Sequence, residues 1–184
     1  MKKLLLFSAL ISITYLANAQ STTYKAFKVD VDLGYAIPSA GTGTGTKAGV
    51  TFTVEPHYRL SDDIAIGFRF EGAGLGYEES NGVTNKTHVS VLTSYCPTFE
   101  YYFVKGGFRP FGGAGAGIFS QQTVNKSSSG NGAALVPGAT NFGVFPRLGF
   151  EAGHLRVSAA YDIVGNNSSY VAFTIGCFFG GGKK

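Results

Sequence analysis

Apolar and polar side chains alternate along most of the chain, most clearly over residues 94–119. From Tyr95 to Phe103 every second residue is apolar, and the alternation resumes from Phe108 to Phe119. Strict alternation predicts strands rather than a helix. The connection Val104–Gly107 is polar and rich in glycine, as hairpin turns are. Each arm has about ten residues, which is long enough to cross a bilayer as a tilted strand.

The same alternation predicts eight strands. They cover residues 27–37, 50–60, 64–76, 87–103, 108–119, 142–152, 155–164 and 170–179. Short turns follow the second, fourth and sixth strands, whereas longer loops follow the others, the longest at 120–141. Short turns at one end and long loops at the other are typical of outer-membrane barrels. We therefore predict an all-β fold, an eight-stranded antiparallel up-and-down transmembrane β-barrel.

Alternation alone does not say which face points outward, because a soluble lipocalin-type barrel also alternates, with its apolar face inward. The apolar face carries more large side chains than the interior of an eight-stranded barrel can hold. It carries no charged residue, as a lipid-facing surface requires. The polar face holds all five arginines and many carboxylates but only Lys28 among the lysines, which is typical of buried ion pairs. We therefore predict a polar lumen and an apolar outer face.

The charged residues of the polar face form the predicted site, a lumen charge network. Its predicted members are Asp30, Asp32, Glu55, Arg59, Arg69, Glu71, Glu100, Arg109, Arg147, Glu151, Arg156 and Asp162. Hairpin register predicts three cross-strand pairs, Glu55 with Arg69, Glu151 with Arg156, and Glu100 diagonally with Arg109. The interpretation that we favour is a structural plug of ion pairs that replaces an apolar core. The alternative is an ion path.

The chain begins with a segment that resembles an export signal. Lys2 and Lys3 precede an apolar run over 4–16, and Ala17-Asn18-Ala19 is an A-x-A cleavage site. We expect residues 1–19 to be a signal peptide rather than a membrane anchor, and 20–184 to be a single barrel domain. The net charge of +4 then falls to +2 when the two leader lysines are removed. No basic patch remains that would suggest nucleic acid.

The histidine, serine and cysteine residues lead to no predicted catalytic, cofactor or metal site. His57 and His88 fall on the polar face, and Ser90 is near His88, but no matching acid accompanies them. Cys96 and Cys177 fall on the fourth and eighth strands and on opposite faces, so we do not expect a disulfide.

Two further features concern the barrel wall. Small residues near Ala36 and Gly115 leave room in the lumen for a ligand pocket, although we expect Phe111, Phe119 and loop residues to fill it. Four prolines lie on the apolar face, and β-bulges are the one explanation that the sequence offers for them. These are Pro56, Pro97, Pro110 and Pro146.

Three stretches resemble the small eight-stranded outer-membrane barrels, namely the OmpA transmembrane domain, OmpX-type proteins and the outer-membrane β-barrel domain family. They are FEYYFVKGGFRPFGGAGAG from Phe99, FPRLGFEAGHLRVSAAYDIVG from Phe145, and YVAFTIGCFF from Tyr170. The resemblance covers the chain after the leader and implies the barrel fold and an outer-membrane location. It does not imply one function, because functions vary within the family.

Three functions follow as hypotheses. The first is a structural or surface-interaction protein of the outer membrane, with membrane lipid around the barrel, a surface partner at the loop 120–141, and a monomeric state. The second is a small pore or transport protein. The third is a membrane-embedded lipid-modifying enzyme, which we do not expect because a nucleophile, base and acid are not grouped in the sequence.

Overall fold

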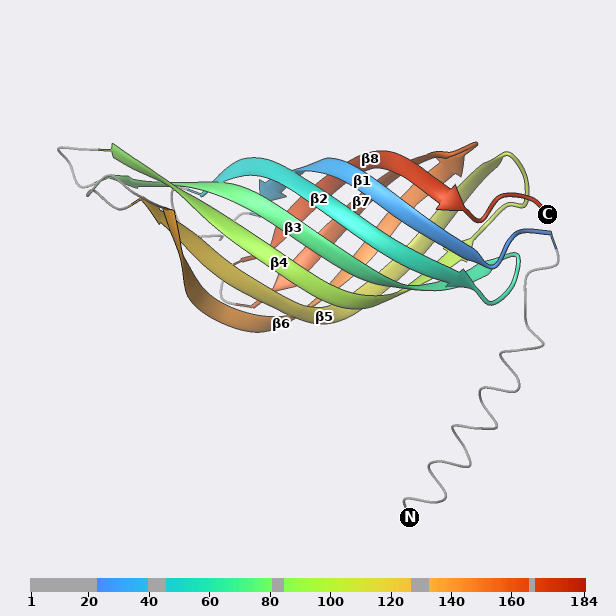
Figure 1. Ribbon diagram of the computed structural model, residues 1–184, viewed down its shortest axis with the longest axis horizontal. Helices are drawn as coiled ribbons and strands as arrows, with labels where there is room; N and C mark the ends of the chain where they lie inside the picture. Colours follow the sequence, from blue (N-terminus) through green and yellow to red (C-terminus); the bar gives the residue numbers. More distant parts are fainter. Residues whose placement is uncertain (1–22, 40–45, 81–84, 127–132, 166–167) are drawn as a thin grey trace, which may run out of the picture.

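The computed structural model describes residues 23–39, 46–80, 85–126, 133–165 and 168–184. The predicted signal peptide lies outside the described residues. The eight strands are β1 (Phe27–Pro38), β2 (Thr46–Arg59), β3 (Ile64–Ser80), β4 (Asn85–Tyr102), β5 (Phe108–Lys126), β6 (Ala133–Ala152), β7 (Leu155–Val164) and β8 (Tyr170–Gly180). Each strand pairs antiparallel with the next, and β8 pairs with β1 to close the barrel (Figure 1). The predicted fold is confirmed. Within the described ranges no helix is long and apolar enough to cross a membrane.

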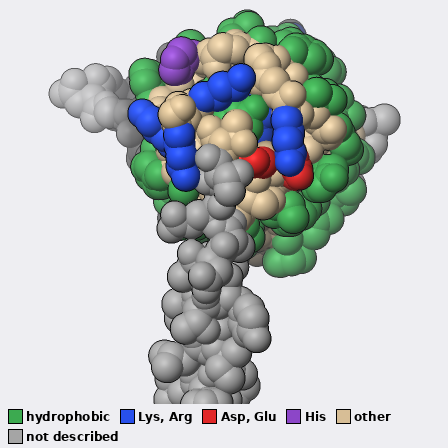
Figure 2. Space-filling view, turned by 90° about the vertical axis from the view of Figure 1, so that its right-hand side faces the viewer, with side chains coloured by type: hydrophobic (Ala, Val, Ile, Leu, Met, Phe, Trp, Pro, Cys, Tyr) green, Lys and Arg blue, Asp and Glu red, His purple; other side chains and the backbone are tan. Residues whose placement is uncertain are grey.

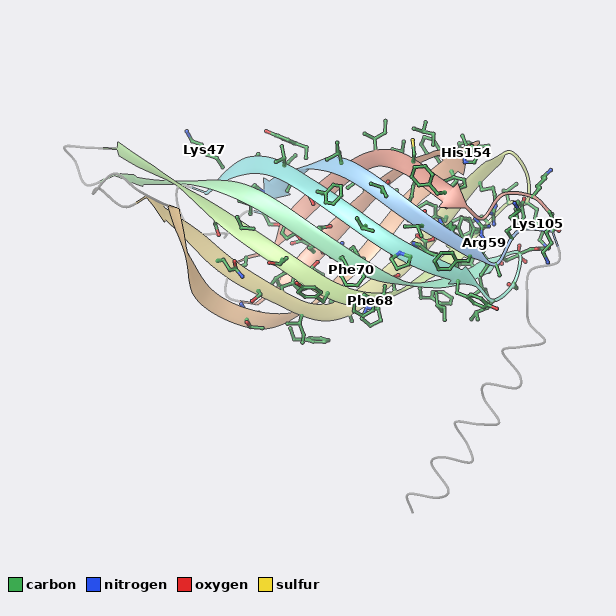
Figure 3. All side chains as sticks on the ribbon, viewed as in Figure 1. Lys47, Arg59, Phe68, Phe70, Lys105 and His154 are labelled. Carbon is green, nitrogen blue, oxygen red and sulfur yellow. The ribbon has the colours of Figure 1, made fainter. Side chains whose placement is uncertain are left out.

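The two faces of the barrel wall divide as the alternation predicts. Large apolar side chains stay exposed on the outside, as at Leu33 (64 % exposed) and Val50 (69 %), whereas Asp30 inside is fully buried. Phe68 and Phe70 on β3 point away from the barrel (Figure 3). Viewed onto the turn end, hydrophobic side chains surround the barrel and Lys and Arg side chains lie within that rim (Figure 2). The polar residues therefore form the interior.

Four strands are much longer than the others. β3, β4, β5 and β6 have 17 to 20 residues, against 10 to 12 in β1, β7 and β8. The predicted loop 120–141 is wrong, because β5 continues to Lys126 and β6 begins at Ala133. The predicted loop after β3 is likewise mostly strand, with Glu78 paired to Thr87. The four strands project beyond the barrel at the end opposite the short turns (Figure 1).

The outward prolines do not mark bulges. Beside Pro56, Pro97 and Pro146 the ladder to the next strand is interrupted, yet the register is the same before and after each interruption. A proline has no N–H to donate, which explains an interruption without an inserted residue. The register shifts lie elsewhere, between Lys47 and Val50 and between Ser120 and Gln122.

The two ends of the barrel domain pair with each other across the turn end. Lys25 N donates to Gly182 O at 2.8 Å and Lys184 N donates to Thr23 O at 3.0 Å, around a bridge between Tyr24 and Lys183. The Tyr24 side chain is buried. These segments therefore cover the lumen at the end where the short turns lie.

Candidate functional site: the charged lumen

All twelve residues of the predicted lumen charge network point inward and are buried. The most exposed, Arg147, is only 7 % exposed. They come from the seven strands β1 to β7, because alternation places every second residue of each strand in the interior. A barrel of eight strands has an interior just wide enough for side chains to fill.

The centre of the lumen is a carboxylate and guanidinium cluster. Arg147 on β6 donates to both carboxylate oxygens of Glu55 on β2, from Nη1 to Oε2 at 2.5 Å and from Nη2 to Oε1 at 2.7 Å. Its Nη2 also lies 2.9 Å from Glu100 Oε1, and the same Glu100 oxygen accepts a bond from Arg156. Such two-point contacts are the strong form of charged hydrogen bonds. The cluster ties together strands that are not neighbours in the sheet.

Towards the turn end, Glu151 collects several cations. Arg156 Nη1 lies 3.1 Å and Arg59 Nη2 3.3 Å from its oxygens, and Lys28 also bonds to it. Arg109 Nη1 lies 3.8 Å away. The Tyr102 hydroxyl lies 2.8 Å from both Glu151 and Glu100 and joins this group to the central cluster.

Aromatic rings stack on the arginines that are nearest the turn end. The Arg109 guanidinium lies 4.0 Å from the Tyr24 ring centroid and 4.1 Å from that of Tyr102. Arg59 lies 5.1 and 5.0 Å from the same two rings. Cation–π contacts of this kind are stronger when water is excluded. Tyr24 therefore fixes the chain's N-terminal segment onto the charge network.

A second cluster lies nearer the projecting end. Arg69 Nη2 is 2.5 Å from Asp162 Oδ1, and Arg69 Nη1 is 3.3 Å from Glu71 Oε2. The Tyr170 hydroxyl donates to the other oxygen of Glu71. The guanidinium of Arg69 also lies 3.5 Å from the ring centroid of Phe145. Arg69 is thus held on its edges by carboxylates and on its face by an aromatic ring.

The three predicted pairs have different outcomes. Glu151 and Arg156 are register partners and are in contact. The β2–β3 register places Glu55 opposite Arg69, but Glu55 binds Arg147 and Arg69 binds Asp162. The third pair is wrong, because Gly113 is the residue opposite Glu100 and Arg109 reaches Glu151 instead. Inside a narrow barrel the opposite wall is as close as the neighbouring strand.

Several lumen residues outside the predicted set take part in the network. Lys28 lies 3.1 Å from Asp30 Oδ2, and Thr98 donates to Glu55. Tyr102 and Tyr170 contribute the hydroxyls described above. The parity of the strands already places Lys28 inward, and the same parity would have found Thr98 and both tyrosines.

His57 lies among three carboxylates. Its Nε2 is 2.9 Å from Asp30 Oδ2 and 3.3 Å from Glu55 Oε1, and its Nδ1 is 3.6 Å from Glu100 Oε2. Asp30, Glu55 and His57 offer three atoms within 4.8 Å of one another, a spacing that metal sites use. Lys28 and Arg147 already bind those carboxylates, so a metal ion would have to displace cations. The arrangement suits an ion-pair cluster better than a metal centre.

Side chains fill the space that small residues leave in the wall. Phe111, Phe119 and Phe145 are each only 1 % exposed. A Cβ added to Gly113 would lie 2.4 Å from Phe99 O and 3.4 Å from Arg147 Nε. A cavity between the two charge clusters has about 10 Å³ open to the centre of a water molecule, which is room for about one water.

The remaining candidate residues, two cysteines, Ser90 and His88, do not form a catalytic group among the residues that the structure describes. Cys96 is buried and Cys177 is exposed, and both thiols are free. Ser90 is buried and accepts a bond from Gln121 Nε2 at 3.1 Å. The side chain of His88 lies outside the described residues. Within the part of the chain that the structure describes, Ser90 therefore has no base beside it.

Comparisons with known proteins define the fold. No protein-family model matches the chain, and no curated protein matches it. Among solved structures, the neisserial surface protein A (NspA) is similar with a TM-score of 0.59 and 16 % identity, covering 85 % of this chain and 98 % of that one. OprG from Pseudomonas aeruginosa is similar with a TM-score of 0.57 and 13 % identity, covering 88 % and 99 %.

A third similar structure, the outer-membrane enzyme PagL, has a lower TM-score of 0.40 with 15 % identity, covering 83 % of this chain and 98 % of that one. At these identities the similarity extends to the fold only, and no activity is transferred. The closed eight-stranded antiparallel wall, its apolar outer face and its charged interior agree with that fold. The chain has the fold of the small eight-stranded outer-membrane β-barrels.

Proposed function

We propose that this protein is an integral outer-membrane barrel that acts as a surface-interaction protein through its projecting end. In this proposal residues 1–19 direct export and are removed. The barrel domain then spans the membrane as a monomer, with the short turns on the periplasmic side and the extended ends of β3–β6 outside the cell.

The observation that carries the proposal is the length of β3 to β6. A strand of about 9–11 residues is enough to cross the membrane, whereas these have 17 to 20. The surplus forms an extended sheet beyond the barrel (Figure 1). β7 pairs with β6 only from Gly143 onward, so within the described residues the stretch Ala133–Phe142 has β5 as its one strand neighbour. A strand edge of this kind offers backbone groups to a partner.

The interior supports an interaction role over transport. Two ion-pair clusters and the buried rings of Tyr102, Phe111, Phe119, Phe145 and Tyr170 occupy the lumen, and Tyr24 covers the turn end. A conducting path would require several of these contacts to break together. An enzyme would require a nucleophile beside a base that is free to take its proton. The carboxylates that accept bonds from Thr98 and Tyr170 are instead already paired with Arg147 and Arg69.

The test shortens the projection and leaves the barrel intact. Ser120 and Thr140 are paired across β5 and β6, so an Asn-Gly turn can replace residues 121–139 as a two-residue hairpin. Cells that display either protein are compared for aggregation with each other and for adhesion to surfaces coated with protein or glycan. A matched control carries Leu148→Val on the outer face of β6, which leaves the projection unchanged.

We expect aggregation or adhesion with the full protein and the control, and its loss with the shortened barrel. Slower migration after boiling in SDS checks that the shortened barrel folds, because closed barrels resist SDS until heated. Equal adhesion of the folded short and full barrels would overturn the proposal. Stable ion-selective channels from the pure full protein would favour the pore instead.

A further inference from the structure

One segment of the barrel wall has almost no side chains on either face. Residues 112–117 of β5 read GGAGAG, so this stretch carries nothing larger than a methyl group. Ala114 and Ala116 point outward, and Gly113 and Gly115 face the lumen. β4 and β6 run along the two sides of β5 (Figure 1).

The neighbouring strands turn this thin segment into a groove on the outer face. Its volume is about 600 Å³. The outward residues that line it are Pro97, Phe99, Ala114, Ala116, Val144 and Pro146. The register sets Ala114 directly between Phe99 and Pro146, so two alanines form the floor and larger side chains form both walls.

The groove is bounded at both ends and from behind. Ile118, which is 52 % exposed, stands on the projecting side. On the turn side the Phe103 ring lies over Gly112, where an added Cβ would be 3.1 Å from Phe103 Cζ. Phe145 fills the space behind Gly115, where an added Cβ would be 2.3 Å from its ring. An occupant can therefore come only from outside the barrel.

We propose that this groove binds an acyl chain of a membrane lipid. The groove lies inside the apolar outer face, between Tyr95 and Leu148, which are 47 % and 68 % exposed. In the membrane that face meets hydrocarbon, so acyl chains surround the groove at high concentration. A flexible chain fills an irregular recess better than a rigid surface does. This inference rests on the barrel spanning a membrane, as proposed above, and is independent of what the projecting end binds.

The gain comes from packing and not from the hydrophobic effect, because lipid tails are as apolar as the wall. Atoms that line an empty recess lack partners on one side and lose those dispersion contacts. A chain seated on Ala114 and Ala116 restores them. We therefore expect one lipid held longer than its neighbours, and not a shell of tightly bound lipid.

A second copy of the chain fits the groove less well. A two-fold interface brings the same patch of both copies together, so the recess of one barrel would face the recess of the other. Both would stay unfilled unless a neighbouring side chain such as Ile118 inserted across the interface. Self-association is therefore the alternative outcome of the test.

The first experiment fills the groove and counts bound lipid. Ala114→Leu places a larger side chain on the groove floor, and Ala159→Leu makes the same change on the outer face of β7, away from the groove. Each barrel is taken from phosphatidylcholine bilayers into detergent and weighed by native mass spectrometry. We expect one retained phospholipid on the wild type and on Ala159→Leu, and its loss on Ala114→Leu.

A second measurement locates the chain. The sequence has no tryptophan, so Phe99→Trp supplies a single reporter at the groove wall and Phe173→Trp a single reporter on β8. In bilayers that contain a small fraction of phosphatidylcholine with brominated acyl chains, we expect stronger quenching of the groove reporter. Adding Ala114→Leu should reduce its quenching to the level of the β8 reporter.

Two results would overturn the inference. One is equal lipid retention by Ala114→Leu and Ala159→Leu together with equal quenching of both reporters. The other is a wild-type dimer that Ala114→Leu alone abolishes, which would assign the groove to a second copy. Migration before and after boiling checks that every variant is folded. These outcomes do not depend on adhesion, so this inference and the proposed function can fail separately.

Discussion

Glu55 on β2 and Arg147 on β6 form a two-point ion pair across the lumen, with nitrogen–oxygen distances of 2.5 and 2.7 Å. The two residues are 92 positions apart, on strands that do not pair with each other. Both side chains are buried. The pair therefore links opposite walls of the barrel, a role that packed apolar side chains have in proteins with a hydrophobic core.

The first prediction tests that link. Glu55→Gln or Arg147→Met alone leaves a buried charge without its main partner, which costs about 3–5 kcal/mol of folding free energy. The double variant should recover much of that loss, although Thr98 and His57 also contact Glu55. Urea unfolding in lipid vesicles measures the coupling in a double-mutant cycle.

The control for this cycle combines Glu55→Gln with Arg69→Met. These two residues lie opposite each other in the β2–β3 register, yet Arg69 binds Asp162 and Glu71. We expect near-additive costs there. Stronger coupling of Glu55 with Arg69 than with Arg147 would contradict the observed pairing.

The second prediction concerns the outer face. Phe68→Arg places a charge among the exposed apolar side chains of β3, and near the middle of a membrane this costs about 2–4 kcal/mol. Thr140→Arg, at an exposed position on the projecting part of β6, should change the free energy of unfolding little. Equal costs for the two variants in lipid vesicles would show that β3 is not embedded as proposed.

The third prediction tests how tightly the lumen is filled. A Cβ at Gly113 would lie 2.4 Å from Phe99 O, so Gly113→Ala should destabilise the barrel by about 1–3 kcal/mol through overpacking. At Gly72, on the outer face, an added Cβ meets nothing within 4 Å. Gly72→Ala should therefore be neutral or slightly stabilising. Thermal unfolding of both variants provides the comparison, and the same loss at both positions would argue against a filled lumen.

The fourth prediction concerns conductance. We expect no stable channels from the wild type in planar bilayers, because two ion-pair clusters occupy the lumen. Tyr24→Ala should leave conductance unchanged, since it uncovers the turn end but leaves Arg147 and Arg69 with their carboxylates. A channel that appears with Tyr24→Ala alone would show that the terminal segment, and not the charge network, closes the barrel.

The sequence by itself determined the strands, their order and the direction of each face. A strand repeats every two residues, so the alternation around Phe99 and Arg109 needs no knowledge of the rest of the chain. Short turns such as Gly153-His154 place neighbouring strands in register, and Glu151 therefore meets Arg156 as local reasoning predicts. The projecting parts of β5 and β6 were not predicted, because apolar and polar residues do not alternate over residues 120–141.

Only the tertiary structure decided which charges meet. The partner of Glu55 is Arg147 and that of Arg69 is Asp162, and neither partner lies on an adjacent strand. Such contacts depend on the stagger and tilt with which eight strands close, which no single hairpin specifies. The outer groove arises in the same way, because Phe99 and Pro146 flank Ala114 only once three strands lie side by side. Period and turn chemistry are local properties, whereas barrel closure is a property of the whole chain.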